Sequence, residues 1–192
     1  MMRLLTSLLF GAALLAAQEP FDVVEATIAQ VHEAMKGGRL SCRELVARYL
    51  KRINAYDKNG AGLNSIVVVN QEAEKQAEEL DRRFAQSGLT GRLHCVPVIV
   101  KDNFETVGLQ TANGALAFAG YLASKDAFQV KRIKEAGALV LAKSNMAEWA
   151  FSPYETVNSI LPGYTRNPYA LERVTAGSSG GTSTAPSSPS RS

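Results

Sequence analysis

Two adjacent serines enclosed by glycines are the first residues of this sequence whose types suggest chemistry. They lie in the stretch Thr-Ala-Gly-Ser-Ser-Gly-Gly-Thr at residues 175–182, which follows an Asn-Pro-Tyr turn. A serine hydroxyl acts as a nucleophile or passes a proton when a base lies beside it. Taken alone, however, a Ser/Gly run is equally typical of a flexible linker, so the rest of the chain decides between the two interpretations.

Two apolar runs upstream each end abruptly in polar residues. The run at 96–100 ends in Lys101-Asp102-Asn103, and the run at 138–142 ends in Lys143-Ser144-Asn145. A helical pattern over 124–135 lies between them, so the order strand, helix, strand predicts a parallel pair joined by a right-handed crossover. Ligand sites in such sheets lie beyond the carboxyl ends of the strands. We therefore expect these polar residues to form a rim where a ligand could bind.

The rest of the chain supplies helices that must support this rim. Apolar residues at three- and four-residue spacing and capping pairs (Asp22 with Glu25, Ser41 with Glu44) mark the helices, and a short β-branched run marks a further buried strand. The predicted helices cover 21–36, 41–57 and 71–87, the predicted strand covers 64–69, a short helical segment covers 145–151, and a long loop covers 152–174. Together with the crossover, this pattern predicts an α/β fold.

Composition and charge exclude several classes of protein. The 192 residues are 46% hydrophobic and 20% charged, which is typical of a globular chain. The net charge of +3 is not clustered in any basic run, so nothing indicates a nucleic-acid partner. Cys42 and Cys95 match no metal-ligand spacing; they could pair in an oxidising compartment, but we interpret Cys95 as a buried packing residue.

The first residues predict export. Met1-Met2-Arg3 precedes an apolar run at 4–17, which is typical of a secretory signal peptide and short for a membrane span. We expect a secreted or periplasmic protein without stable membrane insertion; an uncleaved membrane anchor is the alternative. The predicted organisation is a signal peptide at 1–17, one domain at 21–183, and a Ser/Pro-rich tail at 184–192.

Three segments of this chain, in this order and spacing, resemble the amidase signature family, which includes bacterial amidases and the A subunit of the transamidating amidotransferase. The segments are Val-Pro-Val-Ile-Val-Lys-Asp-Asn at 96–103, Ala-Gly-Ala-Leu-Val-Leu-Ala-Lys-Ser-Asn-Met-Ala-Glu at 136–148, and Thr-Arg-Asn-Pro-Tyr at 165–169 followed by Gly-Ser-Ser-Gly-Gly at 177–181. The resemblance covers roughly residues 40–183. It implies the N-terminal portion of the amidase signature fold, a mixed and largely parallel sheet covered by helices, here incomplete.

The resemblance also implies a Ser–cis-Ser–Lys mechanism that hydrolyses small-molecule carboxamides without a metal or cofactor. Lys101 matches the family's lysine and Ser178 the cis-serine, while Asn145, Met146 and Ser179 are expected to border the substrate. A lysine with an ordinary pKa of about 10.4 is a poor base at neutral pH. In a dry pocket at a strand end its pKa falls, so the neutral amine can accept a proton that Ser178 relays.

Two features depart from the family pattern. Cys95 stands where the family usually has glycine. The family's nucleophilic serine lies beyond the last residue of this sequence, and Pro186 and Pro189 interrupt the helix expected to begin at Gly180-Gly181. We therefore expect a truncated or frameshifted product that is catalytically inactive as it stands. The alternative is a non-catalytic remnant that at most binds a ligand or partner at the sheet rim.

Overall fold

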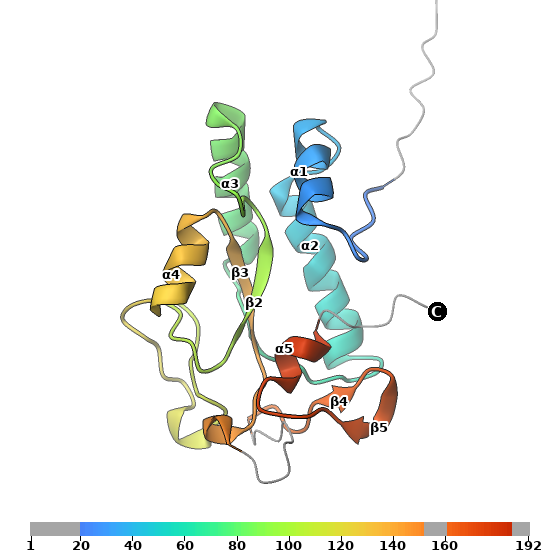
Figure 1. Ribbon diagram of the computed structural model, residues 1–192, viewed down its shortest axis with the longest axis vertical. Coiled ribbons are helices and arrows are strands. Elements are labelled where there is room, and N and C mark those ends of the chain that lie inside the picture. Colours follow the sequence, from blue (N-terminus) through green and yellow to red (C-terminus); the bar gives the residue numbers. More distant parts are fainter. Residues whose placement is uncertain (1–19, 152–160, 186–192) are drawn as a thin grey trace, which may run out of the picture.

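The computed structural model describes residues 20–151 and 161–185, in which helices surround a small central sheet (Figure 1). The predicted leader and residues 186–192 of the predicted tail lie outside the described residues. The α-helices are α1 (Ile28–Lys36), α2 (Cys42–Arg52), α3 (Ala73–Ser87), α4 (Phe128–Glu135) and α5 (Gly180–Thr184). The strands are β1 (Ile66–Val69), β2 (Pro97–Lys101), β3 (Leu139–Ser144), β4 (Arg166–Asn167) and β5 (Ala170–Val174). No helix in the described part of the chain is long and apolar enough to cross a membrane.

The central sheet has the strand order β1-β3-β2 and is mixed. β2 and β3 run parallel, with Lys101 opposite Ser144 at their carboxyl ends, so the parallel pair predicted from the sequence is confirmed. β1 runs antiparallel to β3. Pro97 begins β2, which lies at an edge of the described sheet, where a missing backbone N–H costs least.

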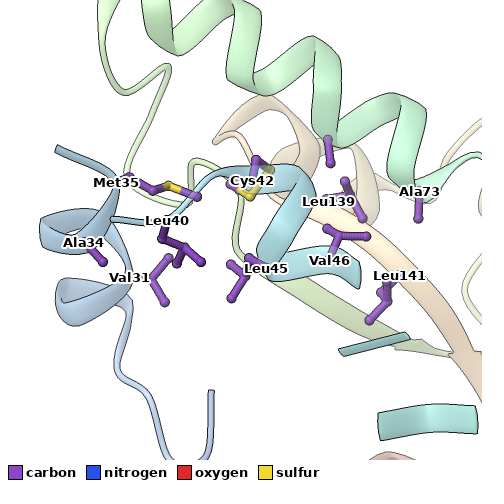
Figure 2. Close-up of a cluster of buried hydrophobic side chains, with 12 residues drawn as sticks. Val31, Ala34, Met35, Leu40, Cys42, Leu45, Val46, Ala73, Leu139 and Leu141 are labelled. Atoms are coloured by element: carbon purple, nitrogen blue, oxygen red, sulfur yellow. A yellow bond between two sulfur atoms is a disulfide. The ribbon is translucent and has the colours of Figure 1, made fainter. Parts of the chain in front are cut away.

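Side chains alternate across β3, and each face of the sheet packs against its own helices. Leu139 and Leu141 join a cluster contributed mainly by α1, α2 and α3 (Figure 2). Val140 lies on the opposite face, where it packs with Val100 of β2 and Val130 of α4. The continuous apolar runs therefore form strands that are covered on both faces, as predicted.

The first helix begins later than predicted. α1 starts at Ile28, after Thr27, whose hydroxyl accepts a hydrogen bond from the backbone N of Gln30 at 3.2 Å. The Gln30 side chain accepts one from the backbone N of Thr27 at 2.8 Å and completes a capping box. Asp22 instead accepts from the backbone N of Val24 in a turn, so it caps no helix.

The second predicted capping box is only half formed. Ser41 accepts a hydrogen bond from the backbone N of Glu44 at 3.0 Å, but the Glu44 carboxylate bonds to Arg48. The carboxylate of Asp81 in α3 accepts from the backbone N of Cys42 at 2.6 Å and thereby satisfies the start of α2 from a neighbouring helix. After α2 the chain continues as a π-helical segment, η1 (Ile53–Lys58), to one residue beyond the predicted end.

Part of the predicted 152–174 loop is a β-hairpin. β4 and β5 pair antiparallel around the Asn-Pro-Tyr turn, in which the Asn167 side chain accepts a hydrogen bond from the backbone N of Tyr169 at 2.9 Å. Residues 152–160 lie outside the described part. The predicted helical segment at 145–151 is reduced to the 3-10 turn η3 (Glu148–Ala150).

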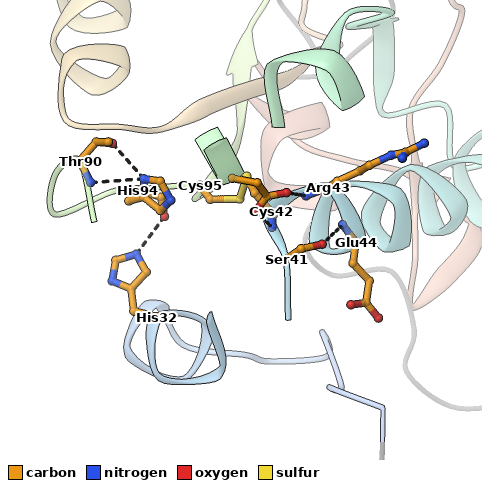
Figure 3. Close-up of a disulfide and its surroundings, with 9 residues drawn as sticks. His32, Ser41, Cys42, Arg43, Glu44, Thr90, His94 and Cys95 are labelled. Carbon is orange, nitrogen blue, oxygen red and sulfur yellow. Dashed lines mark hydrogen bonds between the residues drawn. A yellow bond between two sulfur atoms is a disulfide. The ribbon is translucent and has the colours of Figure 1, made fainter. Parts of the chain in front are cut away.

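Cys42 and Cys95 form a disulfide, with their Cα atoms 5.6 Å apart (Figure 3). The interpretation of Cys95 as a packing thiol is therefore wrong. The bond joins the first residue of α2 to the loop that enters β2, and both cysteines are fully buried.

Candidate active site

Lys101 and the two adjacent serines meet at the carboxyl end of β2. The Lys101 ammonium donates a hydrogen bond to Ser178 Oγ at 2.7 Å and another to Ser179 Oγ at 2.8 Å. Seventy-seven residues separate Lys101 from Ser178 along the chain. The fold therefore brings together the two residues that the sequence predicted to be catalytic, and the Ser/Gly run is a packed turn.

The serine turn is held by backbone contacts to the segment that follows β3. The Gly177–Ser178 peptide bond is cis, in agreement with the cis-serine that the family resemblance implied for Ser178. The Ser178 carbonyl accepts a hydrogen bond from the backbone N of Ala147 at 3.2 Å. Helix α5 begins at Gly180, the start predicted from the sequence, and packs closely on Asn145 and Ser65.

Asn145 and Met146 support this turn from the interior. The Asn145 amide donates hydrogen bonds to the Gly163 carbonyl at 2.9 Å and to Thr165 Oγ1 at 2.8 Å, and both side chains are fully buried. Their predicted roles in substrate binding stay predictions, and this burial favours a role in shaping the site. Ser179, by contrast, is exposed beside Lys101.

Burial lowers the pKa of Lys101 from its ordinary value of 10.5. Removing an ammonium from water disfavours its charged form, and no carboxylate contributes to the shift. The two serine hydroxyls can serve either protonation state, because a hydroxyl both accepts and donates hydrogen bonds. The geometry therefore suits a lysine that alternates between ammonium and amine.

A second lysine, Lys143, has very different surroundings on the neighbouring strand. Its Nζ lies 3.5 Å from Asp102 Oδ1, and both side chains are 0% exposed. The sequence placed this pair on the rim but did not reveal that it is buried. The available signal was position: Asp102 follows Lys101 directly, and Lys143 lies opposite Val100 on the adjacent strand.

Metal binding finds no support in the described ranges, 20–151 and 161–185, where no three His, Cys, Asp or Glu residues are grouped so as to hold an ion. The chemistry available at the site is therefore that of hydroxyls, an amine and backbone dipoles.

Comparison with known proteins adds independent information. A family model described as Amidase matches residues 44–187. The A subunit of the glutamyl-tRNA(Gln) amidotransferase of Halorhodospira halophila is 36% identical over 159 residues, which cover 83% of this chain and 32% of the relative. A probable amidase of Arabidopsis thaliana is 34% identical, with 89% of this chain and 34% of the relative covered.

Solved structures give the same family likeness. A native peptide amidase from Stenotrophomonas maltophilia superimposes with a TM-score of 0.77 at 37% identity, covering 84% of this chain and 34% of the other. An amidase family protein from Bacillus anthracis gives a TM-score of 0.79 at 38% identity, covering 84% of this chain and 33% of the other. The chain thus spans about a third of the length of its relatives.

Proposed function

Because this chain belongs to the amidase family, we propose that Lys101 and Ser178 are the base and the proton relay of a site that hydrolyses carboxamides. The observation that carries the proposal is the 2.7 Å contact between Lys101 Nζ and Ser178 Oγ. It joins a lysine whose pKa is lowered by burial to a half-buried hydroxyl at a strand end. Such a pair is suited to remove a proton from an attacking group.

The proposed reaction begins with Lys101 as a neutral amine. Lys101 accepts the Ser178 proton while Ser178 Oγ accepts the proton of an attacking serine, whose oxygen forms a bond to the amide carbon. The proton then returns through Ser178 to the leaving nitrogen as the C–N bond breaks, which leaves an acyl-enzyme. Water releases the acid by the same relay. The attacking serine is implied by the family resemblance and lies beyond Ser192.

We assign supporting roles to the other predicted residues. Ser179 accepts a second hydrogen bond from Lys101 and so fixes the direction of its side chain. Asn145 and Met146 hold the segment behind Ser178, where substrate contact through their side chains would require the site to open. The substrate class proposed is a small carboxamide, because relatives are named peptide amidase and probable amidase.

A chimera tests this function directly. Residues 20–185 would replace the matching segment of the Stenotrophomonas maltophilia peptide amidase, which supplies the remaining two-thirds, and hydrolysis of peptide amides would be measured. We expect the chimera to be active and Lys101→Met or Ser178→Ala to lower kcat by roughly 10²–10⁴-fold, the usual contribution of a general base. Lys125→Met, which removes an exposed lysine, is the matched control and should retain activity.

The 192-residue polypeptide assayed alone is expected to be inactive, because its relay has no attacking serine to serve. Amide turnover by this polypeptide that disappears in Lys101→Met would contradict the expected inactivity. A folded chimera whose turnover is unaffected by Lys101→Met would refute the proposed relay and favour a non-catalytic role for this face.

We also propose that the protein is exported from the cytoplasm. The apolar leader at 4–17 supports this proposal, and the disulfide between Cys42 and Cys95 supports it independently. Disulfides persist in oxidising compartments and are rare in the cytosol, where thiols are kept reduced.

A further inference from the structure

The ends of β2 and β3 carry two different pairs of polar residues on their two faces. On one face, Lys101 contacts Ser178, and Ser144, its partner across the strands, hydrogen-bonds Thr182 of α5. On the other face, Asp102 meets Lys143. The alternation of side chains along a strand explains this separation, because neighbours in sequence point to opposite faces.

Lys143 binds the loop that follows β2. Its Nζ donates hydrogen bonds to the Phe104 carbonyl at 2.9 Å, the Gln110 carbonyl at 3.2 Å and Thr111 Oγ1 at 2.8 Å. An ammonium has three protons to donate, so these acceptors can use all of them. The lysine therefore ties β3 to two points of the loop at 104–111.

Asp102 secures the other end of the same loop. Its Oδ2 accepts hydrogen bonds from the backbone N of Ala112 at 3.2 Å and of Gly114 at 3.4 Å. Its Oδ1 is buried and has no hydrogen-bond partner among the described residues, so the Lys143 charge is what compensates it. Neither group can be lost alone without leaving a buried charge unpaired.

The pair is a poor device for stability alone. Well-packed apolar side chains often stabilise a fold as much as a buried ion pair, because desolvation offsets the attraction between the charges. A pair of opposite charges does specify which strand end lies beside which. Here that register matters for the other face, because the backbone N of Asp102 donates to the Ser144 carbonyl at 3.2 Å and Ser144 contacts α5.

We propose that Asp102 and Lys143 are positioning residues, whose buried ion pair fixes the ends of β2 and β3 and thereby holds the Lys101 amine against Ser178. The inference rests on the proposed function, in which Lys101 is the base. The pair acts through the strand ends and touches no substrate, and its two members work as one unit.

Positioning and direct electrostatics give opposite expectations. Removing the Asp102 charge would by charge alone lower the Lys101 pKa, whereas removing the Lys143 charge would raise it. Loss of register has one effect in both cases: water enters beside Lys101, and its pKa rises toward the ordinary value. The sign of the two shifts therefore separates the two explanations.

The experiment is an NMR titration of the full 192-residue chain carrying lysine labelled with carbon-13 at Cε, with Lys101 identified by its absence in Lys101→Arg. We expect Asp102→Asn and Lys143→Met each to raise the Lys101 midpoint by about one unit, which lowers the neutral fraction below the midpoint about tenfold. The double variant should shift it by less than the sum of the two, because coupled partners are not additive. Opposite shifts, no shift, or additive shifts would overturn the inference.

Leu45→Ala is the matched control, because Leu45 is fully buried in the cluster of α1, α2 and α3. It should destabilise the fold and leave the Lys101 midpoint unchanged; an equal shift there would reduce the pair to a general structural role. Should a charge variant fail to fold, Thr111→Val removes one Lys143 partner and should shift the midpoint upward by less, whereas Thr111→Ser should restore it.

The wild-type titration keeps this inference separate from the proposed function. A wild-type midpoint at the ordinary value of 10.5 would refute Lys101 as the base. A lowered wild-type midpoint that neither charge variant moves would refute only the positioning role.

Discussion

Lys101 and Lys143 end two adjacent parallel strands, yet their surroundings suit them to different tasks. Burial lowers the pKa of both, that of Lys143 to about 8, although Asp102 acts to raise it. Loss of the Lys143 proton would leave Asp102 as a buried unpaired anion, whereas Lys101 faces two neutral hydroxyls. Lys101 can therefore give up its proton at low cost, as a base must, and Lys143 is suited to remain an anchor.

His94 makes the stability of the fold depend on pH. It is fully buried, its Nδ1 lies 2.9 Å from Thr90 Oγ1, and its Nε2 has no hydrogen-bond partner among the described residues (Figure 3). Burial lowers its pKa below 6.5; the nearby His32 lowers it further, and Asp81 opposes the shift.

As pH falls through 6.5, the unfolded chain takes up a proton at His94 that the folded chain refuses, so the free energy of unfolding decreases. Urea unfolding between about pH 5 and 8, on either side of that value, should show this slope, and His94→Gln should reduce it. An unchanged slope in His94→Gln would assign the pH dependence to other groups.

At the scale of elements, the disulfide joins α2 to the entrance of β2. Cys42 and Cys95 are separated by 53 residues, so reduction should lower the free energy of unfolding by about 2–4 kcal/mol through the greater freedom of the unfolded chain. Thermal unfolding with and without reductant measures this effect. The double variant Cys42→Ala/Cys95→Ala should be insensitive to reductant, and a wild-type chain equally insensitive would contradict the expectation.

Helix α5 approaches β3 so closely that Gly181 has no room for a side chain. An added Cβ would lie 2.4 Å from the Asn145 carbonyl oxygen and 2.7 Å from that of Ser65. Both are backbone atoms, so Gly181→Ala should push α5 outward and destabilise the fold by about 1–3 kcal/mol or more. Urea unfolding checks this; Ser183→Ala, at an exposed position of the same helix, should cost little, and equal costs would contradict the packing argument.

Sequence patterns predicted the types of these elements better than their contacts. The apolar runs identified β2 and β3 because both faces of these strands are covered. The hairpin of β4 and β5 was missed because β5 is largely exposed and lacks an apolar run. The disulfide stayed open because spacing along a chain does not give distance in space.

The candidate site shows the same limit. Lys101 and Ser178 were paired by family resemblance, since nothing in the local pattern joins residues 77 positions apart. Asp102 and Lys143 were assigned to the rim, but the sequence could not tell which side of the strand ends is buried. Burial of Asn145 likewise depends on Thr165 and Gly163, which come from a distant segment.

At the scale of the whole molecule, the chain carries a helix-covered sheet and half of a catalytic relay, and spans about a third of its relatives. Its proposed export makes a separate prediction. Expressed in a bacterium with its leader, the protein should be found outside the cytoplasm, with a new N-terminus close after Ala17 and the two cysteines oxidised. Mass spectrometry of the fractions measures both.

A chain that starts with methionine followed by residues 18–192 is the control for export and should stay in the cytoplasm with reduced thiols. Retention of the intact leader on a cytoplasmic protein would contradict the export proposal, without bearing on the site.

The central claim is that this fold turns Lys101 into a base beside Ser178, and the pKa of the Lys101 amine in the wild-type chain tests it most directly. Titration of the labelled Lys101 Cε by NMR should give a midpoint below the ordinary 10.5, because burial disfavours the ammonium. Ser178→Ala should change the Lys101 signal, since it removes a direct partner. A wild-type midpoint at or above 10.5, with a Lys101 signal indifferent to Ser178→Ala, would contradict the account.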